Sequence, residues 1–75
     1  MYKIIVENLG RLKMPTNIYY AEILGITTSY ISNILGGKLA VKETIAKGMI
    51  AVAYNITLDD ERMTELLEKH FTKEK

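Results

Sequence analysis

The sequence predicts an all-α domain, a compact five-helix bundle with a helix-turn-helix at its second and third helices. Apolar residues recur at helical spacing along most of the 75-residue chain. Thr16 and Thr27 stand where helix N-caps are expected, and glycines follow at the points where each helical period breaks. These signals predict helices over 17–24 and 28–35, joined by a short turn.

Length and composition limit the chain to one domain, residues 1–75, with a modest core. Hydrophobic residues make up 48% of it and charged residues 25%, as in ordinary globular proteins. No apolar run approaches the ~20 residues of a membrane span, no secretory signal is recognisable, and there is no cysteine. We therefore expect a cytoplasmic protein with no membrane association.

The first helix is expected over residues 2–13, where Ile5, Leu9 and Leu12 are spaced i, i+4 and i+7. The β-branched run from Ile4 to Val6 could instead start a short strand. The helical stripe continues to Leu12, which favours the helix.

The third helix, 28–35, is expected to bury Ile31 and Ile34. Ala21 supplies the small side chain that a close crossing of the second and third helices requires. Short polar residues then face outward near the start of the third helix: Thr28, Ser29, Ser32 and Asn33.

A fourth helix is expected over residues 42–54, with Ile45, Met49, Val52 and Ala53 on its buried side. Asn55 suits the left-handed position beyond its end. Gly48, inside it, indicates a close contact with another helix, because glycine otherwise costs helical stability.

A fifth helix is expected over residues 58–71. Thr57 and Asp60 form a pattern like a capping box at its start, and acidic residues follow in the first turn. Its apolar stripe, the candidate dimer interface, comprises Met63, Leu66, Leu67 and Phe71.

The chain resembles the lambda-repressor/Cro (XRE-type) superfamily of helix-turn-helix regulators over about residues 3 to 67. The matching segments are Thr16-Asn17, Ala21, Leu24 to Thr27, Ile31-Ser32, Gly37-Lys38, Ile50-Ala51 and Asn55 to Asp59. The resemblance implies a small phage or mobile-element transcriptional regulator that binds double-stranded DNA, a homodimer on a palindromic operator.

Carried over position by position, the resemblance implies two sets of DNA contacts. Thr28, Ser29, Ser32 and Asn33 would meet base edges in the major groove. Asn17, Thr27, Lys38 and Lys42 would meet the phosphate backbone. The same polar residues could also form only a solvated helix face.

The net charge is the feature that fits DNA binding least well, although the distribution of charge agrees with it. The net charge is only +1, but residues 1–50 hold six basic and three acidic side chains. The expected recognition helix contains no Arg or Lys, so it lacks the usual bidentate contact with guanine. We therefore expect modest affinity per monomer and a dependence on dimerisation. An asparagine can pair with adenine and a threonine methyl group can pack on that of thymine, so we also expect a preference involving A·T pairs.

A second function class stays open. Tyr19, Ile23 and Tyr30 would form an apolar patch on the outside of the motif, suited to contact with a protein. The domain would then be a protein-binding inhibitor or antirepressor. We expect no enzyme, cofactor, metal or small-molecule ligand, since no catalytic or metal-binding constellation is recognisable and the lone His70 is more simply explained by packing.

Overall fold

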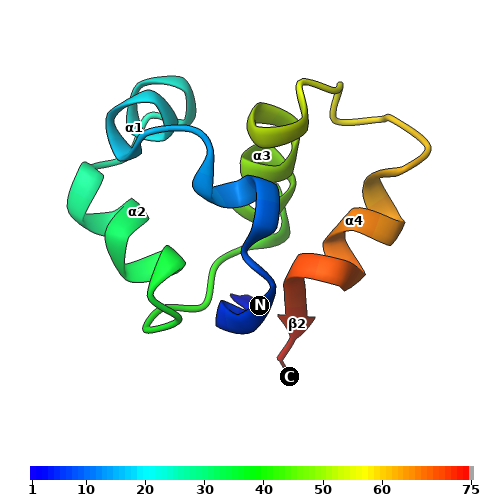
Figure 1. Cartoon of the computed structure of the whole chain (residues 1–75), viewed down its shortest axis with the longest axis horizontal. Coiled ribbons are helices and arrows are strands. Elements are labelled where there is room, and N and C mark those ends of the chain that lie inside the picture. The colour runs from blue at the N-terminus through cyan, green and yellow to red at the C-terminus, as the bar shows by residue number, and fades with distance from the viewer. Residues whose placement is uncertain (75) are drawn as a thin grey trace.

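The computed structural model describes residues 1–74 and contains four α-helices, two short 3-10 segments and two strands within them. In chain order these are β1 (Tyr2–Ile4), η1 (Val6–Asn8), η2 (Gly10–Lys13), α1 (Asn17–Leu24), α2 (Thr28–Leu35), α3 (Glu43–Tyr54), α4 (Met63–His70) and β2 (Phe71–Lys73). Figure 1 shows α1 and α2 at one end, α3 in the centre and α4 at the other end. The helical character was predicted correctly, whereas the all-α, five-helix description was wrong.

The helices α1 and α2 have the predicted bounds, because side chains fix their starts. Thr16 Oγ1 accepts a hydrogen bond from the Tyr19 amide, and Thr27 Oγ1 accepts one from the Tyr30 amide, each at 3.1 Å. Gly25 ends α1 in the left-handed region, with φ 70°. The two helices pack against each other across a three-residue turn.

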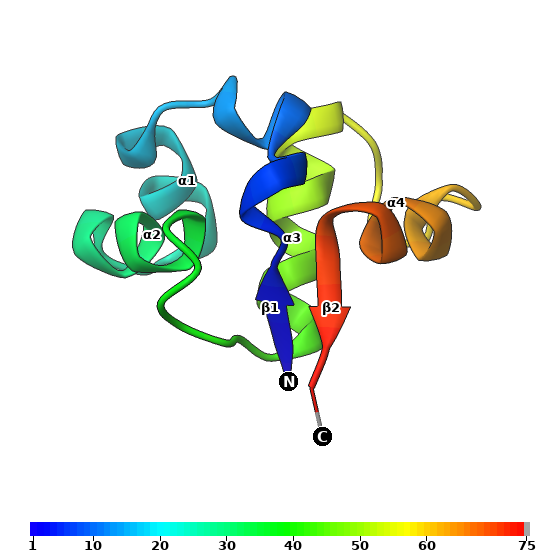
Figure 2. The same cartoon turned by 60° about the horizontal axis from the view of Figure 1, so that its bottom comes forward.

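The first predicted helix, residues 2–13, is wrong. Tyr2–Ile4 forms a strand that pairs antiparallel with β2, with Ile4 opposite Phe71 (Figure 2). Tyr2 exchanges two backbone hydrogen bonds with Val41 on the other edge of β1. Leu9 separates η1 from η2, and the first residue of η2, Gly10, is left-handed with φ 48°, which prevents one continuous helix.

The central helix α3 carries much of the core. It begins at Glu43, with Lys42 at the N-cap, and ends at a left-handed Asn55, φ 55°. A Cβ built on the buried Gly48 would lie 2.6 Å from Leu24 Cδ2, so α1 and α3 approach closely there as predicted. The predicted inner residues Met49 and Ala53 are buried, whereas Ile45 and Val52 are half-buried.

The fifth predicted helix, 58–71, was misplaced at both ends. The helix α4 begins at Met63, because the Asp60 carboxylate accepts hydrogen bonds from the Arg62 amide (2.8 Å) and guanidinium instead of capping a helix. This Arg62 contact holds the pKa of Asp60 below its usual value. At the other end, Phe71 leaves the helix and starts β2.

The core joins residues from every α-helix and both strands. Its buried apolar members are Ile4, Leu12, Tyr20, Ile31, Ile34, Val41, Ala46, Met49, Ile50, Ala53, Met63, Leu67 and Phe71. Within residues 1–74, no helix has the length and apolar character to cross a bilayer.

Candidate nucleic-acid interface

The helix α2 divides into a buried face and a polar, exposed face. Ile31 and Ile34 are fully buried. Thr28, Ser29, Ser32 and Asn33 are all exposed, as the sequence predicted. We call these four side chains the α2 polar edge.

The packing of α2 explains why this edge faces outward. The helix contacts α1 and the strand β1 through its apolar side, and it lies on the outside of the molecule (Figures 1 and 2). No charged residue occurs between Thr28 and Leu35. The α2 polar edge therefore presents hydroxyl and amide groups alone, which both donate and accept hydrogen bonds.

The four residues expected to contact phosphates are also exposed: Asn17, Thr27, Lys38 and Lys42. Lys38 follows the end of α2, and its amide donates to the Asn33 carbonyl oxygen at 3.0 Å. Within residues 1–74 neither Lys38 nor Lys42 forms an ion pair. Both ammonium groups are therefore available to an external anion.

The carboxylate next to Lys42 in the sequence has other partners. Glu43 accepts a hydrogen bond from the Tyr2 hydroxyl at 2.9 Å and pairs with Lys47 at 3.2 Å. Both contacts hold the pKa of the Glu43 carboxyl below its usual value, and the hydrogen bond from Tyr2 has the larger effect. Glu43 is therefore ionised and engaged with Tyr2 and Lys47 at neutral pH.

The predicted protein-contact patch is only partly assembled. Tyr19 and Ile23 are each 51% exposed on α1, but Tyr30 is half-buried against the core. Two apolar residues that the prediction omitted lie at the surface of the same segment: Met14, 76% exposed, and Ile18, 63% exposed. The sequence carries a signal for Ile18, because helical spacing places it on the outer side of α1 with Tyr19 and Ile23, away from the buried Tyr20.

The predicted dimer interface on α4 is wrong for three of its four members. Met63, Leu67 and Phe71 are only 3%, 6% and 3% exposed, and Leu66 is half-buried. The helix α4 packs against α3 and β2, so its apolar stripe covers the core of its own chain. This stripe offers little surface to a second copy.

His70 is a buried structural residue, with 1% of its surface exposed. Its Nδ1 lies 2.6 Å from the Asn8 carbonyl oxygen, and its Nε2 lies 2.6 Å from the Tyr54 hydroxyl. Arg11 lies beside this group, because its Nε donates to the Ala53 carbonyl oxygen and its guanidinium is 5.6 Å from the Tyr54 ring centre. These contacts join η1 and η2 to α3 and α4.

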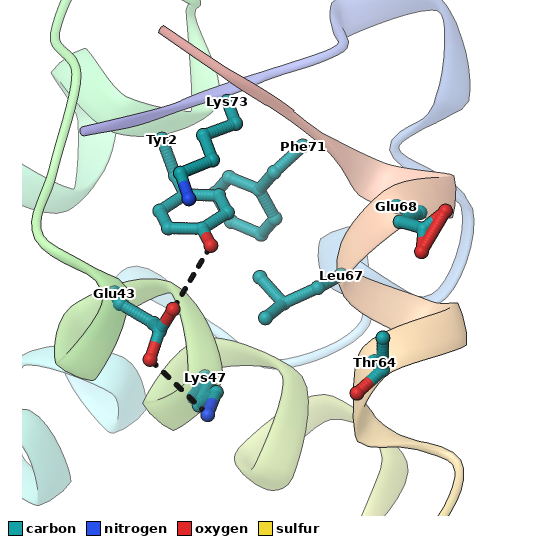
Figure 3. Close-up of a pocket in the computed structure, with 8 residues that line it drawn as sticks. All are labelled: Tyr2, Glu43, Lys47, Thr64, Leu67, Glu68, Phe71 and Lys73. Carbon is teal, nitrogen blue, oxygen red and sulfur yellow. Dashed lines mark hydrogen bonds and ion pairs between the residues drawn. The ribbon is translucent and has the colours of Figure 1, made fainter. Parts of the chain in front are cut away.

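A pocket of about 340 Å³ lies between α3, α4 and the sheet (Figure 3). Tyr2, Leu67 and Phe71 supply apolar lining, and the charged side chains comprise two lysines and two glutamates. Tyr2 and the pocket's α4 residues are far apart in the sequence, so the sequence alone gave no sign of this pocket. The balanced charge and the engaged Glu43 favour no particular ligand.

The α2 polar edge, Lys38 and Lys42 form the candidate site. Comparison of the chain with protein-family models, with curated proteins and with solved structures found no match.

Proposed function

We propose that this chain is a sequence-specific, double-stranded DNA-binding transcriptional regulator whose helix α2 enters the major groove. The observation that carries the proposal is the α2 polar edge, four exposed hydrogen-bonding side chains on one helix whose other face is buried. At 1.5 Å per residue the eight-residue helix is about 12 Å long, which suits a groove about 12 Å wide. The resemblance to lambda-repressor/Cro regulators supports the same role for this helix.

The chemistry of the edge favours A·T pairs. The Asn33 amide can bond to N6 and N7 of adenine together, and the Thr28 methyl group can pack against the methyl group of thymine. Ser29 and Ser32 can donate or accept, so they adapt to either base of a pair. Because no arginine or lysine lies on α2, guanine is recognised poorly.

Backbone contacts supply the remaining affinity. Lys38 and Lys42 would each neutralise a phosphate, and Asn17 and Thr27, at or beside the starts of α1 and α2, would add hydrogen bonds. Each copy would neutralise two phosphates. A plot of the logarithm of the binding constant against the logarithm of the salt concentration should therefore have a slope of about −2 per copy. Such modest electrostatics favour a homodimer that occupies both halves of a palindrome.

The test is selection of bound fragments from random duplex DNA at low salt. We expect enriched palindromes rich in A·T pairs, with half-sites about one helical turn apart. Asn33→Asp adds a negative charge to the edge and should abolish enrichment, whereas Thr64→Asp adds the same charge to an exposed site on α4 and should not. Failure of the folded wild-type protein to bind any duplex would refute the proposal.

A protein-binding inhibitor or antirepressor is the second candidate function. It is favoured by the exposure of Tyr19 and Ile23 on α1. In this case Tyr19→Ala should abolish binding to a defined protein partner, and no duplex DNA should be bound even at low salt. The DNA selection therefore separates the two candidates.

A further inference from the structure

The loop that joins α2 to α3 passes beside the start of the strand β1 (Figure 2). Tyr2 and Val41 exchange two backbone hydrogen bonds, of 2.6 and 2.7 Å, in an antiparallel bridge. Directly opposed side chains share one face of such a bridge, and the side chains next to them share the other face. Val41 is fully buried, so one face of the bridge points into the core and the other points outward.

Lys3 and Lys42 both lie on the outward face of this bridge. Each follows one member of the bridged pair in the chain, and Ile4 turns back into the core with only 5% of its surface exposed. The two lysines are diagonal neighbours in the antiparallel arrangement, which places their Cβ atoms about 7–8 Å apart. The bridge therefore brings Lys3 next to a lysine of the candidate site.

A hollow of about 400 Å³ also connects Lys3 with the end of α2. Lys3 and both glycines of the turn directly before Lys38 line this hollow. The turn and the start of the chain approach each other closely, because a Cβ built on Gly37 would lie 2.8 Å from Val6 Cγ1. Lys3 is therefore a neighbour of both lysines of the candidate site, and we call Lys3, Lys38 and Lys42 the basic cluster.

The charges around the basic cluster indicate what kind of anion fits it. Within residues 1–74, none of its three lysines forms an ion pair. Glu7 and Glu74 line the same hollow as Lys3 without pairing to it. These two carboxylates would repel a small anion inside the hollow. The partner that fits is a polyanion that lies across the three ammonium groups, as the backbone of a duplex does.

We propose that Lys3 is a third phosphate contact of each copy on duplex DNA, an inference that rests on the proposed function. A DNA strand that passes the end of α2 and meets Lys38 and Lys42 also comes within reach of the Lys3 side chain. The strand β1 fixes the Lys3 backbone in place, because Lys3 is paired with Thr72 on one side and the bridge to Val41 lies on the other. Little further ordering is therefore needed for the contact.

The place of Lys3 in the cluster depends on β1, which the sequence did not predict. A helix over residues 2–13 would have separated this side chain from the loop before α3. The strand pairing instead holds the first residues of the chain against residues 37–42. Lys3 therefore joins the site through tertiary structure alone.

The salt dependence of DNA binding measures the number of phosphate contacts. Three contacts should give a slope of about −3 per copy, against about −2 from Lys38 and Lys42 alone. Lys3→Gln removes the charge and keeps the length of the side chain. Between 50 and 200 mM salt, the wild-type protein should lose about 3.5-fold more affinity per copy than this variant.

Titrations use the duplex most enriched in the selection and a duplex of equal length and scrambled sequence. Lys3→Gln should weaken binding to both duplexes alike, and its slope should change as much as that of Lys38→Gln, whatever the number of copies bound. Lys69→Gln, on α4, is the control and should keep the wild-type slope. A wild-type slope for Lys3→Gln would overturn the inference and leave the proposed function standing. A folded wild-type protein that binds no duplex would overturn both.

A rescue variant separates the loss of charge from a loss of structure. Thr72 is exposed directly opposite Lys3 in the strand pair, so its side chain lies on the same outward face. In the Lys3→Gln chain, Thr72→Lys should restore the slope, whereas Thr64→Lys, on α4, should not. Thermal unfolding followed by circular dichroism should show that all these variants are folded. Failure of Thr72→Lys to restore any of the slope would overturn the inference.

Discussion

The Tyr54 hydroxyl lies 2.6 Å from His70 Nε2, and this contact ties the central helix α3 to the end of α4. The Asn8 carbonyl oxygen, 2.6 Å from Nδ1, can only accept a hydrogen bond, so Nδ1 carries the proton. In the neutral ring, Nε2 therefore accepts from Tyr54. Both ring nitrogens are satisfied in a side chain that is almost fully buried.

Tyr54→Phe should lower the free energy of unfolding by about 1–3 kcal/mol, because it leaves Nε2 buried without a donor. Urea denaturation followed by circular dichroism measures the change. Tyr19→Phe is the matched control, since the Tyr19 hydroxyl makes no hydrogen bond within residues 1–74. In dilute protein the control should lie within about 0.5 kcal/mol of wild type. Equal stability of the two variants would contradict the role given to Tyr54.

Leu67→Lys should unfold the domain rather than merely separate a dimer. Leu67 is 6% exposed in the core, so the substitution combines a lost apolar contact with a buried, unpaired charge and should cost more than about 3 kcal/mol. Circular dichroism should show the loss of helix at room temperature. Glu68→Lys, at the exposed neighbouring position, should remain folded. A folded, stable Leu67→Lys chain would mean that α4 packs differently.

Gly37→Ala should be more destabilising than Gly25→Ala. Both glycines have nearly the same left-handed conformation, φ 73° and 70°, so both substitutions carry a conformational cost of about 1 kcal/mol. A Cβ at Gly37 would also lie 2.8 Å from Val6 Cγ1, whereas nothing lies within 4 Å of one at Gly25. The difference between the two thermal midpoints measures this contact between η1 and the loop after α2. Identical midpoints would show that the loop moves freely.

Stability should fall as the pH rises above 10. Burial raises the pKa of Tyr20 well above its usual value of 10.0, and its hydroxyl donates to the Leu12 carbonyl oxygen at 2.7 Å. The contribution of Tyr20 to the free energy of unfolding is fully present below pH 10. At higher pH Tyr20 ionises first in the unfolded chain, so this contribution falls by at most about 1.4 kcal/mol per pH unit. Urea midpoints at pH 9 and 11 measure the slope. Tyr20→Phe should be less stable at pH 9 but should show a flatter alkaline slope, and an unchanged slope would contradict the assignment.

The DNA proposal makes different predictions for bases and phosphates. Asn33→Ala should relax the preference at one A·T pair, with a loss of about 1–3 kcal/mol on the best site. Lys38→Ala should weaken all sequences alike and reduce the salt slope by about 1 for each copy bound. Titrations of fluorescent duplexes at several salt concentrations measure both. Lys69→Ala, on α4, is the matched control and should leave the slope unchanged.

The parts of the fold that were predictable are those set by local chemistry. Thr16 and Thr27 cap their helices through their own hydroxyl groups, and Gly25 ends α1 two residues before the second cap. The alternation of Ile31 and Ile34 with short polar residues similarly predicted which side of α2 is exposed. Each of these signals lies within a few residues of the feature it determines.

The errors arose where distant partners decide the conformation. The run from Ile4 to Val6 allowed a strand as well as a helix, and β1 forms because Phe71–Lys73 pairs with it from the other end of the chain. The exception is a local error: Asp60 matched a capping pattern, but Arg62, two residues further on, engages its carboxylate and the helix starts later. The apolar stripe of α4 was visible in the sequence, while its burial depends on α3 and β2.

The strand pairing also brings the first and last described residues together, with the Met1 amino group 3.2 Å from the Glu74 carbonyl oxygen. A linker of a few residues could therefore join them into a closed ring without disturbing the core. New ends could then be opened in the segment between α3 and α4, where Leu58 is 60% exposed. Tags or fusion partners on such a circular permutant would then lie away from the α2 polar edge and from the exposed Tyr19 and Ile23 of α1.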